Sequence, residues 1–243
     1  HILDLVPTFL GAHSIPNEYK DNKSEYINIV CDEMIPMVSK NSLAEFCDVF
    51  CEKKYFNYDD SYRILKAAKK YGLIPRLHAD EFEDSRGLEL ALELNAISAD
   101  HLMAANSKMF KKLGKSNVVS VLLPGTTFFL GQSNYVNARE MLDNHCEIAI
   151  ASDFNPGSCT INSLPQIMFL SMLYCKMTFS EVFKGVTINA AKAINREKSI
   201  GLIKEGYNAD LLFWDIDSIY EIPYWFNSER LFKIIKNGKL ISL

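Results

Sequence analysis

Histidines and carboxylates, the side chains that hold metal ions and move protons, recur where short apolar segments of this chain end. His78 closes LIPRLH, His101 closes AISADH, Asp153 follows EIAIAS and His13 follows LVPTFLGA. Glu81 stands three residues after His78, in the stretch LHADE. Ionisable groups are costly at the end of a buried segment unless they meet a partner or do chemistry. Imidazole and carboxylate ligands suit Zn²⁺ or Fe²⁺, so the pattern indicates a metal-dependent site.

Each of these residues also has a plain structural interpretation. A single histidine at a strand end is more often a hydrogen-bonded core or loop residue than a ligand, Asp153 could cap the next loop, and Glu81 could be solvated. Three of only five histidines at such positions, together with Asp153, favour a shared site. We expect the other two, His1 and His145, to be solvated. Asp80 points to the other side of an extended chain from Glu81, so we expect a structural role for it.

The elements that must position these residues alternate along the chain. We predict strands at 5–12, 46–51, 73–78, 96–101, 118–124 and 147–152, with amphipathic helices between them, one of which ends near Gly72. Thr178 to Glu181 (TFSE) predicts a capping box at the start of a further helix. Continuous apolar strands that alternate with helices predict a parallel sheet, and six units in series favour a (β/α) barrel over a doubly wound sheet. In such a barrel the carboxyl ends of the strands meet on one face.

The domain organisation changes near residue 198. Residues 1–197 read as the barrel, and 198–243 contain short alternating segments with glycine turns, which predict part of a small β-sandwich domain. No G-x-G-x-x-G or G-x-x-x-x-G-K-[ST] follows a predicted strand, which disfavours dinucleotide and P-loop sites.

Composition excludes several classes of protein. Apolar residues make up 48% and charged residues 23%, as in ordinary globular proteins. A net charge of −4 disfavours nucleic-acid and anionic-membrane partners, and no apolar run is long enough to predict a membrane span. The six cysteines form no C-x-x-C pair, and Cys47 and Cys51 lie roughly 13 Å apart if their segment is a strand. We therefore expect reduced thiols and a cytoplasmic protein, rather than a disulfide framework or a zinc–thiolate site.

Several motifs carry a family resemblance. LHADE, SADHL, LLPGTTF, ASDFNPGS, the opening PTFLGAHSIPNEYK and the tail GLIKEGYNADL resemble the imidazolonepropionases of the amidohydrolase superfamily, over essentially all 243 residues. The tail alone would indicate only the superfamily. The resemblance implies a (β/α)8 TIM-type barrel, a homodimer and one divalent metal, zinc or iron. It also implies hydrolysis of the ring amide C–N bond of 4-imidazolone-5-propanoate to N-formimidoyl-L-glutamate, in histidine degradation.

The resemblance also assigns roles, position by position. His78 and Asp153 match metal ligands, and Glu81 matches a substrate-binding carboxylate that shuttles protons. His101 matches a catalytic histidine. The remaining matches are substrate contacts: His13, and the loop residues Asn155, Gly157 and Ser158, which would hold the carboxylate end.

One departure from the family pattern changes the expected activity. The family has a His-x-His pair on its first barrel strand, and no such pair occurs here. We count about six barrel strands where the family has eight. We therefore expect a fragment that lacks roughly the first 40% of a family member, with at most trace activity alone.

The residues suggest a mechanism and leave rival functions open. Asp153 would bind the metal and accept a proton from water, His101 would stabilise the developing oxyanion, and Glu81 would pass a proton to the departing ring nitrogen. The nearest rival is a deaminase of an amino-heterocycle from the same superfamily. A loop such as 155–158, which suits a carboxylate tail, separates the two. A third reading is an inactive fragment, or half of a split enzyme, with exposed sheet edges.

Overall fold

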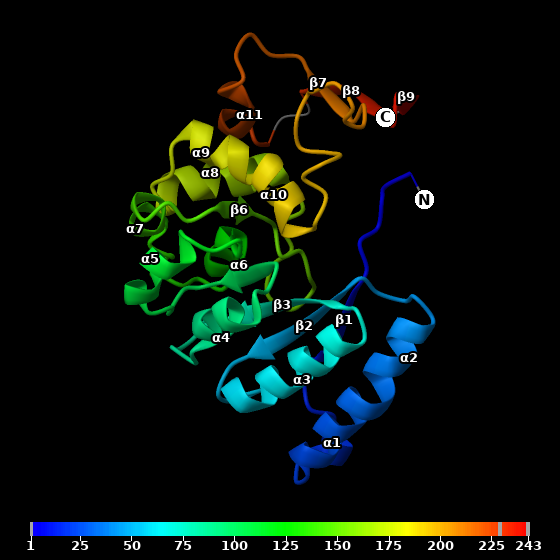
Figure 1. The fold of residues 1–243 in the computed structure, drawn as a ribbon. Coiled ribbons are helices and arrows are strands. Elements are labelled where there is room, and N and C mark those ends of the chain that lie inside the picture. The colour runs from blue at the N-terminus through cyan, green and yellow to red at the C-terminus, as the bar shows by residue number, and fades with distance from the viewer. Residues whose placement is uncertain (1, 228–229, 242–243) are drawn as a thin grey trace. The chain divides into compact units, whose positions relative to one another are not determined.

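Six strands follow one another in a single sheet. The computed structural model describes residues 2–227 and 230–241 (Figure 1). Its strand order is β1-β2-β3-β4-β5-β6. Their bounds are β1 Thr8–Ala12, β2 Phe46–Cys51, β3 Ile74–Ala79, β4 Ser98–His101, β5 Val119–Leu122 and β6 Ile148–Ile150. The pairs from β1 to β4 are parallel. Each predicted strand is present, and the sequential order confirms the barrel-type prediction, because a doubly wound sheet reverses its strand order at a switch point.

Helices separate the strands and form much of the remaining chain. Their bounds are α1 Lys23–Ile29, α2 Ile35–Lys40, α3 Tyr58–Lys70, α4 Gly87–Leu94, α5 Phe110–Leu113, α6 Pro124–Phe129, α7 Ala138–Asp143, α8 Leu164–Tyr174, α9 Phe179–Gly185, α10 Ile188–Ala193 and α11 Glu221–Tyr224. A π-helical turn, Val30–Met34, joins α1 to α2. Pro36, two residues after the end of this turn, lies in the first turn of α2, where its missing N–H is tolerated.

By internal contacts the chain divides into two compact units. The first unit comprises Asp4–Ser120 and Glu140–Glu147, and the second comprises His1–Leu3, Val121–Arg139 and Ile148–Leu243. The predicted site residues His13, His78, Glu81 and His101 lie in the first unit. Asp153 and the loop that follows it lie in the second.

In the first unit, helices cover the buried strands β2 and β3. Helix α3 packs on both strands and α4 packs on β3. A capping box between Asn57 and Asp60 opens α3, and Gly72, with a φ of 81°, follows its end as predicted. Gly87 opens α4 so close to β3 that an added Cβ would lie 2.7 Å from the Cβ of Ala79. The sheet and α4 therefore need glycine at this contact.

In the second unit, α8 packs against α6, α9, α11 and β6. The capping box predicted at Thr178 and Glu181 opens α9. A separate antiparallel sheet contains β7 Leu211–Trp214, β8 Leu231–Lys236 and β9 Lys239–Ile241, which confirms the prediction of a small β unit. Asn237 and Gly238, with φ of 51° and 75°, make the tight turn between β8 and β9.

The remaining sequence expectations concern thiols, solvated histidines and membranes. All six cysteines are free and buried, which confirms the expectation of unpaired thiols. His145 is exposed as predicted, whereas His1 lies outside the described residues. Within residues 2–227 and 230–241, no helix is both long and apolar enough to cross a membrane.

Candidate functional site

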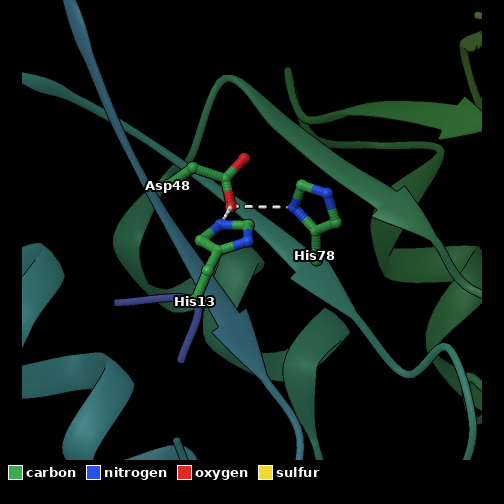
Figure 2. A group of neighbouring side chains, drawn as sticks. All are labelled: His13, Asp48 and His78. Atoms are coloured by element: carbon green, nitrogen blue, oxygen red, sulfur yellow. Dashed lines mark hydrogen bonds and ion pairs between the residues drawn. The ribbon is translucent and has the colours of Figure 1, made fainter. Parts of the chain in front are cut away.

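Two of the predicted site histidines meet on a carboxylate that the sequence reading did not select. Asp48, in the middle of β2, places its Oδ1 3.0 Å from His13 Nε2 and 2.8 Å from His78 Nδ1. Figure 2 shows both imidazoles directed at this one oxygen. His13 directly follows β1 and His78 lies on β3, so β2 places Asp48 between them. The two rings pack edge to face, with centroids 4.7 Å apart.

The Asp48 carboxylate is buried, with only 2% of the residue exposed. Burial raises the pKa of its carboxyl, but the charge of His78 and the hydrogen bonds from both histidines outweigh this effect and hold the pKa well below its usual range. Its other oxygen, Oδ2, lies 3.4 Å from Nε of Arg76. Asp48 is therefore an ionised carboxylate held between cationic and imidazole groups.

A second carboxylate continues this charge network. The Nη2 of Arg76 donates to Oδ2 of Asp100 over 2.9 Å, and the hydroxyl of Ser98 donates to Oδ1 of Asp100. Asp100 raises the pKa of Arg76 despite burial, so the guanidinium remains charged. Asp48 and Arg76 are register partners on neighbouring strands, as are Arg76 and Ser98. The parallel register thus builds the chain of contacts across β2, β3 and β4.

The other two predicted residues of the first unit, Glu81 and His101, also lie together. His101 Nε2 is 3.6 Å from Oε2 of Glu81, and the ring of His101 packs beside that of His78 at a centroid separation of 5.3 Å. Burial, and then the charge of His78, lower the pKa of His101 to about 3. At neutral pH His101 is therefore an uncharged imidazole that carries one N–H donor.

Two further buried carboxylates shape the loop after β3. Asp80 accepts hydrogen bonds from the N–H groups of Ser85, Gly87 and Leu88 and thereby caps α4, which confirms its structural role. Burial raises the pKa of Asp80 and these hydrogen bonds oppose the shift. Glu52, directly after β2, accepts from the N–H groups of Glu81 and Phe82 and from the hydroxyl of Ser85. The loop that carries Glu81 is therefore fixed at its backbone.

In the second unit, the predicted residues after β6 form one hydrogen-bonded loop. The hydroxyl of Thr126 donates to Oδ2 of Asp153 over 2.6 Å. Asn155 donates from Nδ2 to the carbonyl of Asp153 and to Oγ of Ser158, and its Oδ1 accepts the N–H groups of Gly157 and Ser158. The four residues Asp153, Asn155, Gly157 and Ser158 are thus brought together by contacts that are local in sequence.

Backbone strain marks the same places. Asp80, His101 and Asp153 have positive φ values of 52°, 72° and 52°. Residues other than glycine rarely adopt this backbone conformation. Where a fold holds them in it, the positions are often functional. Asp80 already has a structural reason, whereas His101 and Asp153 are both predicted site residues.

The donor chemistry of the first unit fits a divalent metal ion. Within the described part of the chain, His13, Asp48 and His78 each offer a ligand atom, and these atoms lie within 4.8 Å of one another. Imidazole nitrogen and carboxylate oxygen are the donors that Zn²⁺ and Fe²⁺ take. The three atoms presently make hydrogen bonds, so an ion at this position would have to displace them. Nε2 of His78, the ring nitrogen that does not contact Asp48, offers a second position for an ion. An ion there would leave the hydrogen bond between His78 Nδ1 and Asp48 intact.

Asp48 and Glu52 are buried carboxylates in contact with predicted site residues, and the sequence analysis did not select them. Asp48 lies inside FCDVFC, which drew attention only for its cysteines. A carboxylate inside a buried strand is costly unless it has partners, and this signal could have identified it. The identity of those partners, 30 and 35 residues away, comes only from the fold.

Comparison with known proteins places the chain in a family. Residues 56–241 match the sequence model described as the Amidohydrolase family. The chain is 47% identical over 239 residues to a protein named imidazolonepropionase from Alkaliphilus oremlandii, which covers 98% of this chain and 57% of that protein. It is 43% identical over 242 residues to one of the same name from Treponema denticola, with 59% of that protein covered. The chain therefore spans somewhat over half the length of these relatives.

Solved structures agree on the fold. An adenosine deaminase from Xanthomonas campestris, solved with bound zinc, superposes with a TM-score of 0.72 at 14% identity, over 97% of this chain and 60% of that chain. A variant of atrazine chlorohydrolase from Arthrobacter aurescens gives 0.70 at 13% identity, over 96% and 67%. The TM-scores show that the fold is shared. At such low sequence identity they show nothing about the reaction, which must be argued from the site.

Proposed function

The chain belongs to the amidohydrolase family, and on that premise we propose that the protein is an imidazolonepropionase. It would hydrolyse the ring amide C–N bond of 4-imidazolone-5-propanoate to give N-formimidoyl-L-glutamate, a step in histidine degradation. The observation that carries this proposal is the 47% identity to the Alkaliphilus oremlandii imidazolonepropionase over 98% of this chain.

We propose that His78 and Asp153 are ligands of one divalent metal, zinc or iron. The chemistry of their donor atoms suits both ions. When bound, such an ion supplies Lewis acidity and lowers the pKa of water into the neutral range. A second ligand arrangement, His13 with Asp48 and His78, is offered by the first unit itself.

The protein's own residues would then move the protons. Asp153, with one oxygen held by Thr126, would accept the proton of the attacking water. His101 would donate a hydrogen bond to the oxyanion that develops on the ring carbonyl, and its lowered pKa supports the neutral form that this role requires. Glu81 would bind the ring nitrogen and deliver a proton to it as the C–N bond breaks.

The substrate would be oriented at its two ends. His13 would contact the imidazolone ring. Asn155, Gly157 and Ser158 would bind the propanoate carboxylate, and the convergence of the Gly157 and Ser158 N–H groups on one acceptor supports this assignment. The substrate carboxylate would take the place of Asn155 Oδ1 at these two donors.

The remaining expectations also stand as proposals. We propose that residues 1–197 belong to the barrel domain and 198–243 to the small β domain. We further propose that the protein works as a cytoplasmic homodimer on this small molecule. Six buried free thiols support a reducing compartment.

The test is a comparison of substrates. The chain would be assayed alone and joined to the part of the Alkaliphilus oremlandii relative that it does not match, with zinc or iron supplied. We expect the joined protein to open 4-imidazolone-5-propanoate and to lose about 10²–10⁴-fold in kcat on Glu81→Gln, since general acid–base catalysis contributes about that much. Deamination of guanine or cytosine without ring opening would replace the proposal with a deaminase.

A further inference from the structure

None of the residues assigned to the reaction lies on strand β2, yet side chains on and directly after this strand contact three of them, His13, His78 and Glu81. Residues 48 and 50 lie on the same side of the strand, and Glu52 directly follows its end at the next alternate position. Asp48 contacts His13 and His78. Phe50 packs its ring near both imidazoles, with centroids 6.0 and 5.9 Å away, and Glu52 accepts the N–H of Glu81. Asp48, Phe50 and Glu52 therefore contact the candidate site residues His13, His78 and Glu81 from the same strand and its end.

The contact at Asp48 determines which nitrogen of each imidazole bears the proton. An ionised carboxylate only accepts hydrogen bonds. His13 Nε2 and His78 Nδ1 both approach Oδ1 of Asp48 within 3.0 Å, so both nitrogens must carry hydrogen. A neutral imidazole has one N–H and one lone pair. The lone pairs then lie on Nδ1 of His13 and on Nε2 of His78, which face away from Asp48.

The network behind Asp48 keeps its carboxylate in place. Arg76 lies 3.4 Å from its second oxygen and is itself fixed by Asp100 over 2.9 Å. A carboxylate with contacts at both oxygens gives the two imidazoles one acceptor at one position. Partners of this kind set the tautomer and the ring orientation of metal-binding histidines.

We propose that Asp48 is a positioning residue that locks His78 in the Nδ1–H tautomer and His13 in the Nε2–H tautomer. Nε2 of His78 is thereby kept as a lone pair for a divalent ion, and Nδ1 of His13 is kept as an acceptor toward the substrate. What those lone pairs bind rests on the proposed function. The tautomers themselves do not, because Asp48 imposes them within the first unit.

The competing arrangement makes the opposite prediction. If His13, Asp48 and His78 held an ion among themselves, Nε2 of His13 and Nδ1 of His78 would carry the lone pairs. The remaining proton of His78 would then sit on Nε2. When Zn²⁺ is added to the chain, the protonated nitrogen of His78 therefore separates a positioning carboxylate from a ligand carboxylate.

Nitrogen NMR of the 243-residue chain reads the tautomers directly. The chain would be labelled with ¹⁵N-histidine, and long-range ¹H–¹⁵N spectra would be recorded at rising pH until the ring ¹⁵N shifts no longer change. Five histidines give few enough signals to assign His13 and His78 by their loss in His13→Gln and His78→Gln. We expect Nδ1–H at His78 and Nε2–H at His13. Nε2–H at His78 overturns the proposal.

Two variants show that Asp48 causes the tautomer. Asp48→Ala, or the similarly sized Asp48→Leu if the alanine variant does not fold, should return most of the His78 population to Nε2–H, the form that free imidazole side chains favour, because neither side chain has an acceptor oxygen. Glu52→Gln is the matched control, because Glu52 is equally buried directly after β2 and contacts neither imidazole. It should leave both histidine signals in place. A His78 tautomer that persists without the Asp48 carboxylate overturns the proposal.

The experiment separates the two levels of inference. The tautomers are read without turnover, before and after Zn²⁺ is added, so they can hold while imidazolonepropanoate is not hydrolysed. In that case the proposed function fails and the positioning role stands. If a protein whose His78 is Nε2–H opens the imidazolone ring, the proposed function stands and the positioning role of Asp48 fails.

Discussion

The strand ends of the first unit and the loop after β6 in the second unit both hold predicted site residues, but by different means. Around Asp48 the contacts are between charged or ionisable groups, and their partners are 24 to 35 residues apart. In the loop, Asn155 makes its hydrogen bonds to residues two or three positions away, through neutral groups. The first arrangement depends on the sheet register, whereas the second needs only its own turn.

This difference predicts how far the effect of a substitution extends through the structure. A group in the network is buried among partners on several strands, so its loss exposes uncompensated charge across the sheet. A group in the loop supports a local turn, and its loss should stay local. The following predictions probe that contrast.

The largest effect is expected for Asp48→Ala. This substitution removes the carboxylate that pairs with the buried guanidinium of Arg76. Breaking a buried ion pair by removing one partner destabilises proteins by about 3–5 kcal/mol. The free energy of unfolding, measured by urea denaturation, should fall by this amount. Asp143→Ala, at an exposed position of α7, should stay within about 0.5 kcal/mol of the parent chain. A loss at Asp48 as small as at Asp143 would show that the network does not stabilise the unit.

The next effect concerns Glu52→Ala, which removes the acceptor for two backbone N–H groups of the loop after β3. Hydrogen bonds to a charged acceptor contribute about 1.5–3 kcal/mol, so the amides of Glu81 and Phe82 should exchange at least about tenfold faster. Hydrogen-exchange NMR measures this directly, with amides of α8 as the internal control. Unchanged exchange at Glu81 and Phe82 would mean that Glu52 does not fix the loop.

A smaller, local effect is expected for Asn155→Ala. The N–H groups of Gly157 and Ser158 lose their shared acceptor, so their exchange should accelerate, while the free energy of unfolding of the chain falls by only about 1 kcal/mol. Asn155→Asp keeps the acceptor oxygen and should preserve the protection of both amides. A global loss as large as that of Asp48→Ala would contradict the contrast between network and loop.

The smallest effect lies in the three-stranded sheet and concerns pH. Burial raises the pKa of Asp210, but the hydrogen bonds from Lys236 and the N–H of Asn237 outweigh it and lower the pKa below 3.8. A lowered pKa means stabilisation that is present above the unfolded value and is lost as pH falls through the folded value. The ¹⁵N shift of Asn237 should therefore titrate with a midpoint below 3.8, and Asp210→Asn should abolish it. A midpoint at or above 3.8 would contradict the assignment.

Much of the fold could be predicted because its signals are local. Most of the six strands lie in short, largely apolar runs between polar segments, and the capping box at Thr178 and Glu181 is a four-residue motif. Strand-end residues such as His78 and His101 stand out for the same reason. Asp48 does not, because its importance lies in partners that the sheet register brings to it. A sequence shows that a buried carboxylate needs partners, but only the fold shows which ones it has.

The measurement that tests the account most directly is metal content together with product formation. It would use this chain joined to the unmatched part of the Alkaliphilus oremlandii relative, beside the same protein carrying Asp153→Ala or His78→Ala. The account predicts about one zinc or iron ion per chain and release of N-formimidoyl-L-glutamate from 4-imidazolone-5-propanoate, with both lost in either variant. A protein that forms this product with no bound metal, or that keeps its metal and activity without His78 and Asp153, would contradict it.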